Sequence, residues 1–309
     1  MQRAVITGAF SYIGAAAARE LRRRGWQVHT LTNRARPAGA EHVTAAPLRF
    51  EHEHLVRELK DADAFVNTFW IRLPYAGQSF ESAVEQSGLL NKAAAQAGVR
   101  RLVHVSVSNA SLDSPLGYYR GKAEVDEAVR LCGLSHAIVR PTLVVGEHDV
   151  LTSNIAWLLR RFPVFPVPAG GRYRLQPVTL HDTARVIADA VESDASLDID
   201  AAGPDIMSFR EYVALVARAC GLRRAIISVP RWASLLAIRM LGLVLRDVLL
   251  TSEELAGLEQ ELLVSHAPAL GTESVTEWLM AHGNEIGRRY VNDADRHFGR
   301  GASSAVLAP

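Results

Sequence analysis

Short apolar runs alternate with amphipathic stretches through the first half of the chain. The apolar runs predict strands over residues 3–7, 27–32, 43–48, 64–68, 101–107 and 136–140, and the stretches between them predict helices over 15–24, 55–59, 79–97 and 118–132. Gly25, Gly98 and Gly133 follow three of these helices directly, where glycine commonly ends a helix. Strands that alternate with helices in this way predict an α/β fold, a doubly wound parallel sheet with helices on both faces.

The pattern changes after Gly146. One helix is predicted over residues 153–161, and the Pro- and Gly-rich stretch after it predicts a loop or irregular strands. A helix over 179–191 and a strand over 196–201 resume the earlier pattern, and the chain after Ser208 is mainly helical. We therefore expect a first domain of residues 1–150 with 178–203 returning to it, a smaller, mostly helical C-terminal domain of 151–177 and 204–300, and a flexible tail at 301–309.

The composition is that of an ordinary globular protein and narrows the possible partners. Lys plus Arg total 34 against 33 Asp plus Glu, which argues against a nucleic-acid-binding protein, since such proteins normally carry a basic excess. The two cysteines, Cys132 and Cys220, cannot form a disulfide framework, and the N-terminal stretch is one short strand rather than a signal peptide. We therefore expect a cytoplasmic protein.

The longest apolar region outside the predicted strands runs from Trp232 to Leu250. It contains Arg239 and Arg246, whereas a membrane span needs about 20 largely uncharged residues. An amphipathic helix is the favoured interpretation, and we predict no transmembrane segment. Peripheral contact with a membrane or a partner protein through 232–250 is the alternative, and the sequence leaves the oligomeric state undetermined.

A glycine motif follows the first predicted strand and opens the first helix. It reads Thr7-Gly8-Ala9-Phe10-Ser11-Tyr12-Ile13-Gly14. Gly8 can form the tight turn at the strand end, and Gly14 lets the helix pack closely on the sheet. Free amides and the helix dipole at this point favour negative charge, so the motif predicts a site for the pyrophosphate of a dinucleotide. Ser11 replaces the usual middle glycine and offers a hydroxyl to phosphate. The alternative is a strand–helix turn without a ligand.

The end of the second predicted strand indicates which dinucleotide is bound. NAD selection normally uses an Asp or Glu there, but this chain has Asn33, Arg34 and Arg36, and no acid before Glu41. An arginine can pair with a ribose 2′-phosphate. NADP(H) is therefore favoured and NAD(H) is the alternative. If no cofactor binds here, Arg34 and Arg36 belong to a solvated loop.

A tyrosine and a lysine stand four residues apart at the start of a predicted helix. Tyr118 and Lys122 share one helical face, and a nearby ammonium lowers the pKa of a phenol. The pair can therefore exchange a proton with a substrate oxygen while hydride moves to or from a nicotinamide. Ser106 and Ser108 end the fifth strand, and either could orient the substrate oxygen. A solvated helix face is the competing reading.

These features occur in order along the chain, together with Arg140-Pro141-Thr142 after the sixth strand and Pro177-Val178-Thr179-Leu180-His181-Asp182. The combination resembles the extended and atypical short-chain dehydrogenase/reductase superfamily, which contains sugar-nucleotide epimerases and dehydratases. Within it the likeness is greatest to the NmrA-like and complex I accessory-subunit-like branch. The resemblance covers about residues 1–205, and it implies a Rossmann-type doubly wound sheet with a smaller C-terminal substrate domain.

The resemblance also implies a set of site residues. Those expected at the cofactor are Thr7, Gly8, Phe10, Ser11, Tyr12, Ile13, Gly14, Asn33, Arg34, Arg36, Asn67, Thr68, Phe69, Lys122, Pro141 and Thr142. Tyr118 is expected to be catalytic, with Lys122 and with Ser106 or Ser108 as its partners. The implied function is an NADP(H)-dependent oxidoreductase or epimerase-like enzyme acting on a small molecule. The alternative is a non-catalytic NADP(H)-binding redox sensor or structural accessory protein.

Two other groups of residues have simpler interpretations. His52 and His54 flank Glu53, where a solvated helix start is favoured over a metal site. The aromatic residues of the second domain, Trp157, Phe162, Phe165 and Tyr173, either line a substrate cleft or pack in the core.

Overall fold

The computed structural model describes residues 1–74 and 77–292, and the chain forms two compact units. The first unit comprises residues 1–142, 180–202 and 265–271, and the second comprises 143–179, 203–264 and, among the described residues, 272–292. Residues 265–271, which the sequence pattern assigns to the second domain, lie in the first unit. The predicted tail at 301–309 lies outside the described residues.

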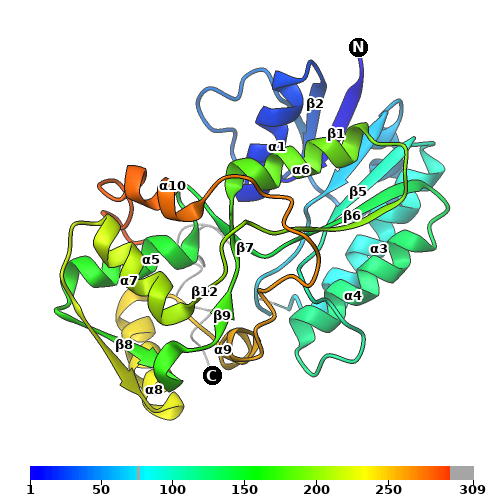
Figure 1. Cartoon of the computed structure of the whole chain (residues 1–309). Helices are drawn as coiled ribbons and strands as arrows, with labels where there is room; N and C mark the ends of the chain where they lie inside the picture. The colour runs from blue at the N-terminus through cyan, green and yellow to red at the C-terminus, as the bar shows by residue number, and fades with distance from the viewer. Residues whose placement is uncertain (75–76, 293–309) are drawn as a thin grey trace. The chain divides into compact units, whose positions relative to one another are not determined.

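The first unit is built on a parallel seven-stranded sheet (Figure 1). Its strand order is β11-β6-β5-β4-β1-β2-β3, and every pairing is parallel. The strands are β1 (Arg3–Thr7), β2 (Gln27–Leu31), β3 (Thr44–Ala46), β4 (Ala64–Asn67), β5 (Arg101–Val105), β6 (Ser135–Pro141) and β11 (Leu197–Ala201). The strand order reverses between β1 and β4, which is the point where sheets of this kind bind ligands at their carboxyl edge. The predicted doubly wound fold is confirmed.

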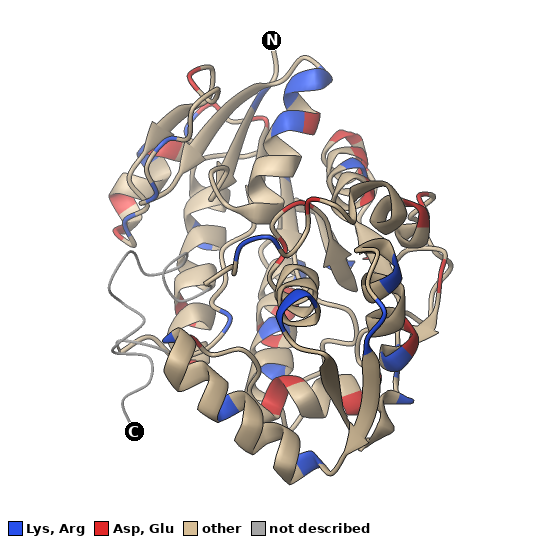
Figure 2. Cartoon of the chain, turned by 90° about the vertical axis from the view of Figure 1, so that its left-hand side faces the viewer, with Lys and Arg blue, Asp and Glu red and all other residues tan. Residues whose placement is uncertain are grey.

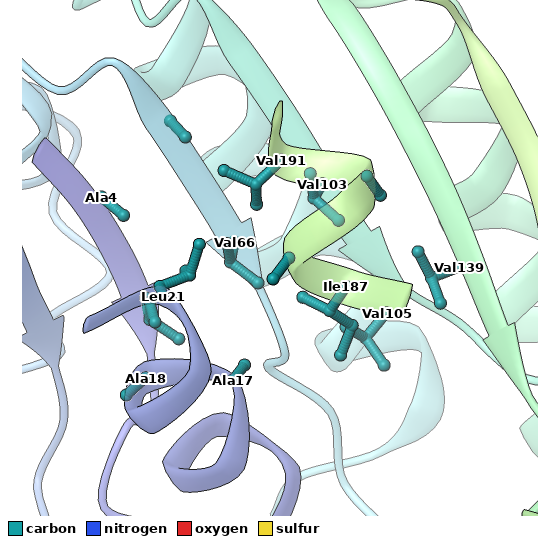
Figure 3. Packing of buried hydrophobic residues seen from close by; sticks show 14 of the residues in the cluster. Ala4, Ala17, Ala18, Leu21, Val66, Val103, Val105, Val139, Ile187 and Val191 are labelled. Atoms are coloured by element: carbon teal, nitrogen blue, oxygen red, sulfur yellow. The ribbon is translucent and has the colours of Figure 1, made fainter. Parts of the chain in front are cut away.

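Helices cover both faces of this sheet. One face carries α1 (Tyr12–Arg23) and α6 (Leu180–Glu192), and the other carries α2 (His52–Leu59), α3 (Phe80–Gln96) and α4 (Gly117–Arg130). Side chains alternate along each strand, so Ile6 packs with the α1 and α6 side chains while Val5 packs with α3 and α4. Figure 3 shows the first of these cores, where Leu21 and Ile187 meet the valines of β4, β5 and β6.

Local signals explain where several helices begin. Ser79 caps α3 through a capping box, in which its side chain accepts from the amide of Ser82 and the Ser82 side chain accepts from the amide of Ser79. Helix α1 begins at Tyr12, three residues before the predicted start. Gly14, which was expected to lie in the turn before the helix, is part of its first turn. Helix α2 likewise begins early, at His52.

The turn between β1 and α1 depends on two glycines. Gly8 has a φ of +70°, which glycine adopts without steric cost. A Cβ on Gly14 would lie 2.3 Å from the carbonyl oxygen of Gly8 and would clash with it. The first turn of α1 therefore lies directly against the end of β1, as the glycine motif predicts.

The second unit combines helices with three two-stranded sheets within its described residues. The sheets pair β7 (Leu143–Val145) with β10 (Pro177–Thr179), β9 (Arg174–Leu175) with β12 (Met207–Ser208), and β8 (Val164–Pro168) with β13 (Ala225–Val229). The helices are α5 (Val150–Arg161), α7 (Phe209–Ala219), α8 (Arg231–Leu245), α9 (Ser252–Glu259) and α10 (Val275–His282). Helix α8 ends at Leu245, before the predicted boundary, because Arg246 adopts the left-handed conformation.

Acidic and basic residues are interspersed over the elements of both units (Figure 2). This mixture agrees with a formal net charge of +1.

The close approach at Gly14 gives a stability prediction with an internal control. Gly14→Ala should lower the free energy of unfolding by about 1–3 kcal/mol, because the added methyl group overpacks the turn. Gly88→Ala in α3 should raise it by about 0.5–1 kcal/mol, because nothing lies within 4 Å of its added Cβ and alanine favours the helix. Urea denaturation of both variants measures the difference. Equal effects would show that the turn is not tightly packed.

Candidate functional site

Hydrogen bonds join the carboxyl ends of β1 and β4. The Thr7 hydroxyl accepts from the amide of Thr68 at 2.8 Å, and the Thr68 hydroxyl donates to the Thr7 carbonyl at 2.5 Å. The Asn67 side-chain oxygen accepts from the amide of Phe69 at 3.0 Å. Thr7, Asn67, Thr68 and Phe69, four of the residues predicted to meet a cofactor, therefore lie together at the strand-order reversal.

The N-terminus of α1 opens onto the same edge. Ser11 is the N-cap residue, and its side chain accepts no hydrogen bond from the helix amides. Its hydroxyl donates instead to the Gly8 carbonyl at 2.5 Å, and its contact with a phosphate stays a prediction. The side chains of Phe10 and Ile13 pack against the hydrophobic core of the sheet, and this packing fixes the orientation of the turn between them. The backbone of the first turn, from Tyr12 to Gly14, is left as the group that can meet an anion.

The residues after β2 have different environments. The Asn33 side chain donates to the Leu48 carbonyl at 2.9 Å and accepts from the Leu48 amide at 3.0 Å, so it joins the ends of β2 and β3. Arg34 is half-buried and Arg36 is exposed. The first acid, Glu41, accepts from the amide of Gly39 within its own loop. Asn33 therefore has a structural function in addition to its predicted position near the cofactor.

The chain beyond β5 continues beside β6. The amide of Ser106 donates to the Val139 carbonyl at 2.8 Å, and that of Ser108 donates to the Pro141 carbonyl at 3.0 Å. Both serines are buried, and the amide of Thr142 bonds the Ala201 carbonyl. The predicted serines, Pro141 and Thr142 thus lie at one edge of the sheet.

An indole ring contacts both members of the predicted Tyr–Lys pair. The Trp70 ring lies edge-on to that of Tyr118, with centroids 6.0 Å apart, and the Lys122 Nζ is 4.7 Å from the Trp70 centroid. Phe80 stacks on the indole with ring centroids 6.2 Å apart, and it lies edge-on to Tyr118 at 6.0 Å. A Cβ on Gly121 would lie 3.0 Å from Trp70, so this glycine lets the indole approach α4. Aromatic rings therefore surround the half-buried Tyr118.

Lys122 is deeply buried and carries a weakened charge. Its side chain is 3% exposed, and its Nζ donates to the Val105 carbonyl at 2.8 Å. Burial lowers the pKa of Lys122 to about 7, although the nearby Asp126 carboxylate opposes the shift. The amine is therefore divided between its charged and neutral forms near neutral pH.

A buried polar network lies behind Lys122. The Asp126 carboxylate accepts from the Arg140 guanidinium at 3.0 Å and lies 3.7 Å from the His104 ring. Burial raises the pKa of Asp126, and the Arg140 charge opposes this shift only in part. Burial and the Lys122 charge hold the pKa of His104 well below its usual value, so this imidazole is neutral. The buried Ser106 hydroxyl has no hydrogen-bond partner among the described residues.

Sequence reasoning missed Trp70, Asp126 and His104. Asp126 is four residues after Lys122, so the spacing that pairs Tyr118 with Lys122 also puts Asp126 on the same helical face. His104 interrupts an apolar strand, which is a second available signal. Trp70 directly follows the predicted cofactor segment, but no local pattern connects it to α4.

The two histidines near the start of α2 differ in environment. His52 begins α2, but His54 is buried and its Nε2 lies 2.9 Å from the Pro47 carbonyl, so the expected solvated helix start is wrong for His54. Among residues 1–74 and 77–292, no cluster of His, Cys, Asp and Glu suits a metal ion.

Helix α8 carries exposed apolar side chains. Trp232, Leu236 and Met240 stand four residues apart and are each more than half exposed. No helix in the described part of the chain is long and apolar enough to cross a membrane. Contact with a membrane surface or a partner through 232–250 stays the alternative interpretation.

Comparison with known proteins agrees with the architecture of the site. A family described as NAD(P)H-binding matches residues 8–194, more than half of the chain. The chain is 24% identical over 230 residues to the "NADH dehydrogenase [ubiquinone] 1 alpha subcomplex subunit 9, mitochondrial" of Arabidopsis thaliana, covering 69% of this chain and 56% of the relative. It is 28% identical over 171 residues to a ceramide reductase of Caulobacter vibrioides, covering 52% of each. The chain thus spans about half the length of these curated relatives.

Solved structures share the fold at low sequence identity. A nucleoside-diphosphate-sugar epimerase from Staphylococcus aureus superposes with a TM-score of 0.72 at 16% identity, covering 91% of this chain and all of the other. A UDP-N-acetylglucosamine 4-epimerase from Bacillus cereus gives a TM-score of 0.64 at 14% identity, covering 74% of this chain and 86% of the other. The predicted likeness to the extended short-chain dehydrogenase/reductase superfamily and its complex I accessory branch is confirmed.

The lowered pKa of Lys122 predicts how stability changes with pH. An unfolded lysine keeps its proton up to about pH 10.4, whereas the folded one releases it near pH 7, so Lys122 makes stability rise with pH between these values. The difference in unfolding free energy between wild type and Lys122→Met should therefore shift in favour of wild type by about 2 kcal/mol from pH 7 to pH 9. Denaturant titrations at both pH values measure it. A pH-independent difference would mean that the folded lysine keeps an ordinary pKa.

Proposed function

Because the chain belongs to the NAD(P)H-binding family, we propose that it binds NADP(H) at the carboxyl edge of the seven-stranded sheet and acts as an oxidoreductase or epimerase-like enzyme. The observation that carries the proposal is the contact of Gly14 with the Gly8 carbonyl, which sets the first turn of α1 against the strand-order reversal. Gly8, Ser11 and Gly14 would lie along the pyrophosphate, with the backbone of Tyr12 and Ile13 as donors.

The preference for a phosphorylated dinucleotide rests on charge. Arg34 would pair with the ribose 2′-phosphate, with Arg36 as a second cation nearby. The absence of an acid between Thr32 and Glu41 removes the usual partner of an unphosphorylated ribose. NADP(H) is therefore favoured over NAD(H).

The chemistry would centre on Tyr118. A bound nicotinamide would supply or accept the hydride. The Tyr118 hydroxyl would exchange a proton with the substrate oxygen, and the aromatic rings of Trp70 and Phe80 would exclude water from that exchange. The protonated, positively charged form of Lys122 would stabilise the Tyr118 phenolate. Ser106 or Ser108 would orient the substrate oxygen, and the buried Ser106 hydroxyl has no partner among the described residues.

A second candidate function is cofactor binding without turnover, as in a redox sensor or an accessory subunit. The observation in its favour is that Lys122 donates to the Val105 carbonyl and has a lowered pKa, which weakens its action on Tyr118. The similarity to a complex I accessory subunit points in the same direction. Substrate turnover by the purified protein distinguishes the two.

Calorimetric titration tests the cofactor preference. Wild type should bind NADPH more tightly than NADH, and Arg34→Ala should weaken NADPH binding about 10- to 100-fold with little effect on NADH, because a charge-assisted hydrogen bond is lost. Arg22→Ala is the matched control, since it removes the same charge from an exposed position on α1. Equal wild-type affinities for the two cofactors would refute the preference.

NADPH oxidation with a panel of ketones and aldehydes tests the role of Tyr118. For any substrate turned over, Tyr118→Phe should lower kcat/KM about 10²- to 10⁴-fold, because the proton donor is lost. Tyr119→Phe removes the neighbouring hydroxyl and should leave kcat/KM nearly unchanged. An unchanged rate in Tyr118→Phe would rule out the mechanism, and tight NADPH binding without turnover of any substrate would favour the accessory function.

A further inference from the structure

The second unit contains an apolar cavity of about 370 Å³. Its walls come from α5, β8 and α8, with Leu158, Phe165 and Leu241 among the lining side chains. The volume is more than twice that of a cavity of about 150 Å³ that takes up benzene, and it falls within the range of small-molecule sites. A chain of several methylene groups can therefore fit.

The walls offer few hydrogen-bond donors. Pro163, Pro166 and Pro168 line the cavity and have no backbone N–H. Asn154 also lines it, but its side chain donates to the Val291 carbonyl and accepts from the Val291 amide, both at 3.0 Å. The remaining lining residue with a polar side chain is Tyr173.

Tyr173 carries a buried hydroxyl without a hydrogen-bond partner among the described residues. The residue is 8% exposed, and its ring stacks on Phe209, a second lining residue, at 5.5 Å. Burial, together with the Glu259 charge, raises the pKa of Tyr173, so the group stays an O–H donor. A buried unpaired donor in a native structure calls for a partner, and a ligand acceptor would supply one.

We propose that this cavity binds a neutral molecule with a single alkyl chain and one hydrogen-bond acceptor, such as a long-chain ketone. The acceptor bonds the Tyr173 hydroxyl, and the chain lies against Leu158, Phe165 and Leu241. The Glu259 charge, which acts on Tyr173, disfavours a carboxylate head group although Arg231 pairs with Glu259 at 3.3 Å. The site lies within the second unit, so the inference does not depend on the proposed cofactor function.

Fluorescence of N-phenyl-1-naphthylamine, a neutral apolar dye, tests the cavity in the full chain. The dye should bind, and 2-undecanone should displace it. Leu241→Trp fills the cavity and should weaken dye and ketone binding at least tenfold. Met240→Trp adds the same side chain on the neighbouring, exposed position of α8 and should leave both affinities unchanged. Failure of the ketone to bind, or equal affinities in the two tryptophan variants, would overturn the proposal.

Tyr173→Phe tests the polar contact separately. It removes one unpaired hydroxyl, so thermal stability should be kept or raised. The affinity for 2-undecanone should fall about three- to tenfold, while that for the dye stays constant. Undecanoate should compete less well than the ketone in the wild type. An unchanged ketone affinity in Tyr173→Phe, or tighter binding of undecanoate, would contradict the assigned head-group contact.

Discussion

The contact between Gly14 and the Gly8 carbonyl is the constraint on which the cofactor edge depends. Gly14 has no side chain, so α1 can begin directly over the end of β1; a Cβ at this position would clash with the Gly8 carbonyl. The apolar face of α1 then packs on the sheet through Ala17 and Leu21, and Thr7 joins β1 to the Thr68 backbone. Helix, strand and loop are thereby held together, so the helix N-terminus meets the edge where the strand order reverses.

The environment of Lys122 shows how burial limits the chemistry of a side chain. Packing against Trp70 and bonding to Val105 hold the amine in place, but the removal of water lowers its pKa. Asp126 restores part of the lost charge stabilisation and is itself held by Arg140. The same surroundings therefore set both the position of the amine and the pH range over which it is charged.

The sequence was most informative where a single backbone position determines structure. Gly8, Gly14 and the alternation of apolar runs predicted the turn and the parallel sheet, because they reflect local conformation and burial. The direction of the Ser11 hydroxyl and the indole at Lys122 were not predictable, since each depends on atoms brought together by folding. The cavity at Tyr173 was predicted only in part from the sequence. Four aromatic residues suggested a cleft, and three of them, Phe162, Phe165 and Tyr173, line the cavity.

The first turn of α1 is the proposed binding position of the dinucleotide. Hydrogen–deuterium exchange with and without saturating NADPH tests this position, because the first-turn amides would become hydrogen-bond donors to the cofactor. Exchange should slow in peptides covering residues 7–16 and 66–70 and should stay the same over 225–250. Unchanged exchange over 7–16 in the presence of NADPH would contradict it.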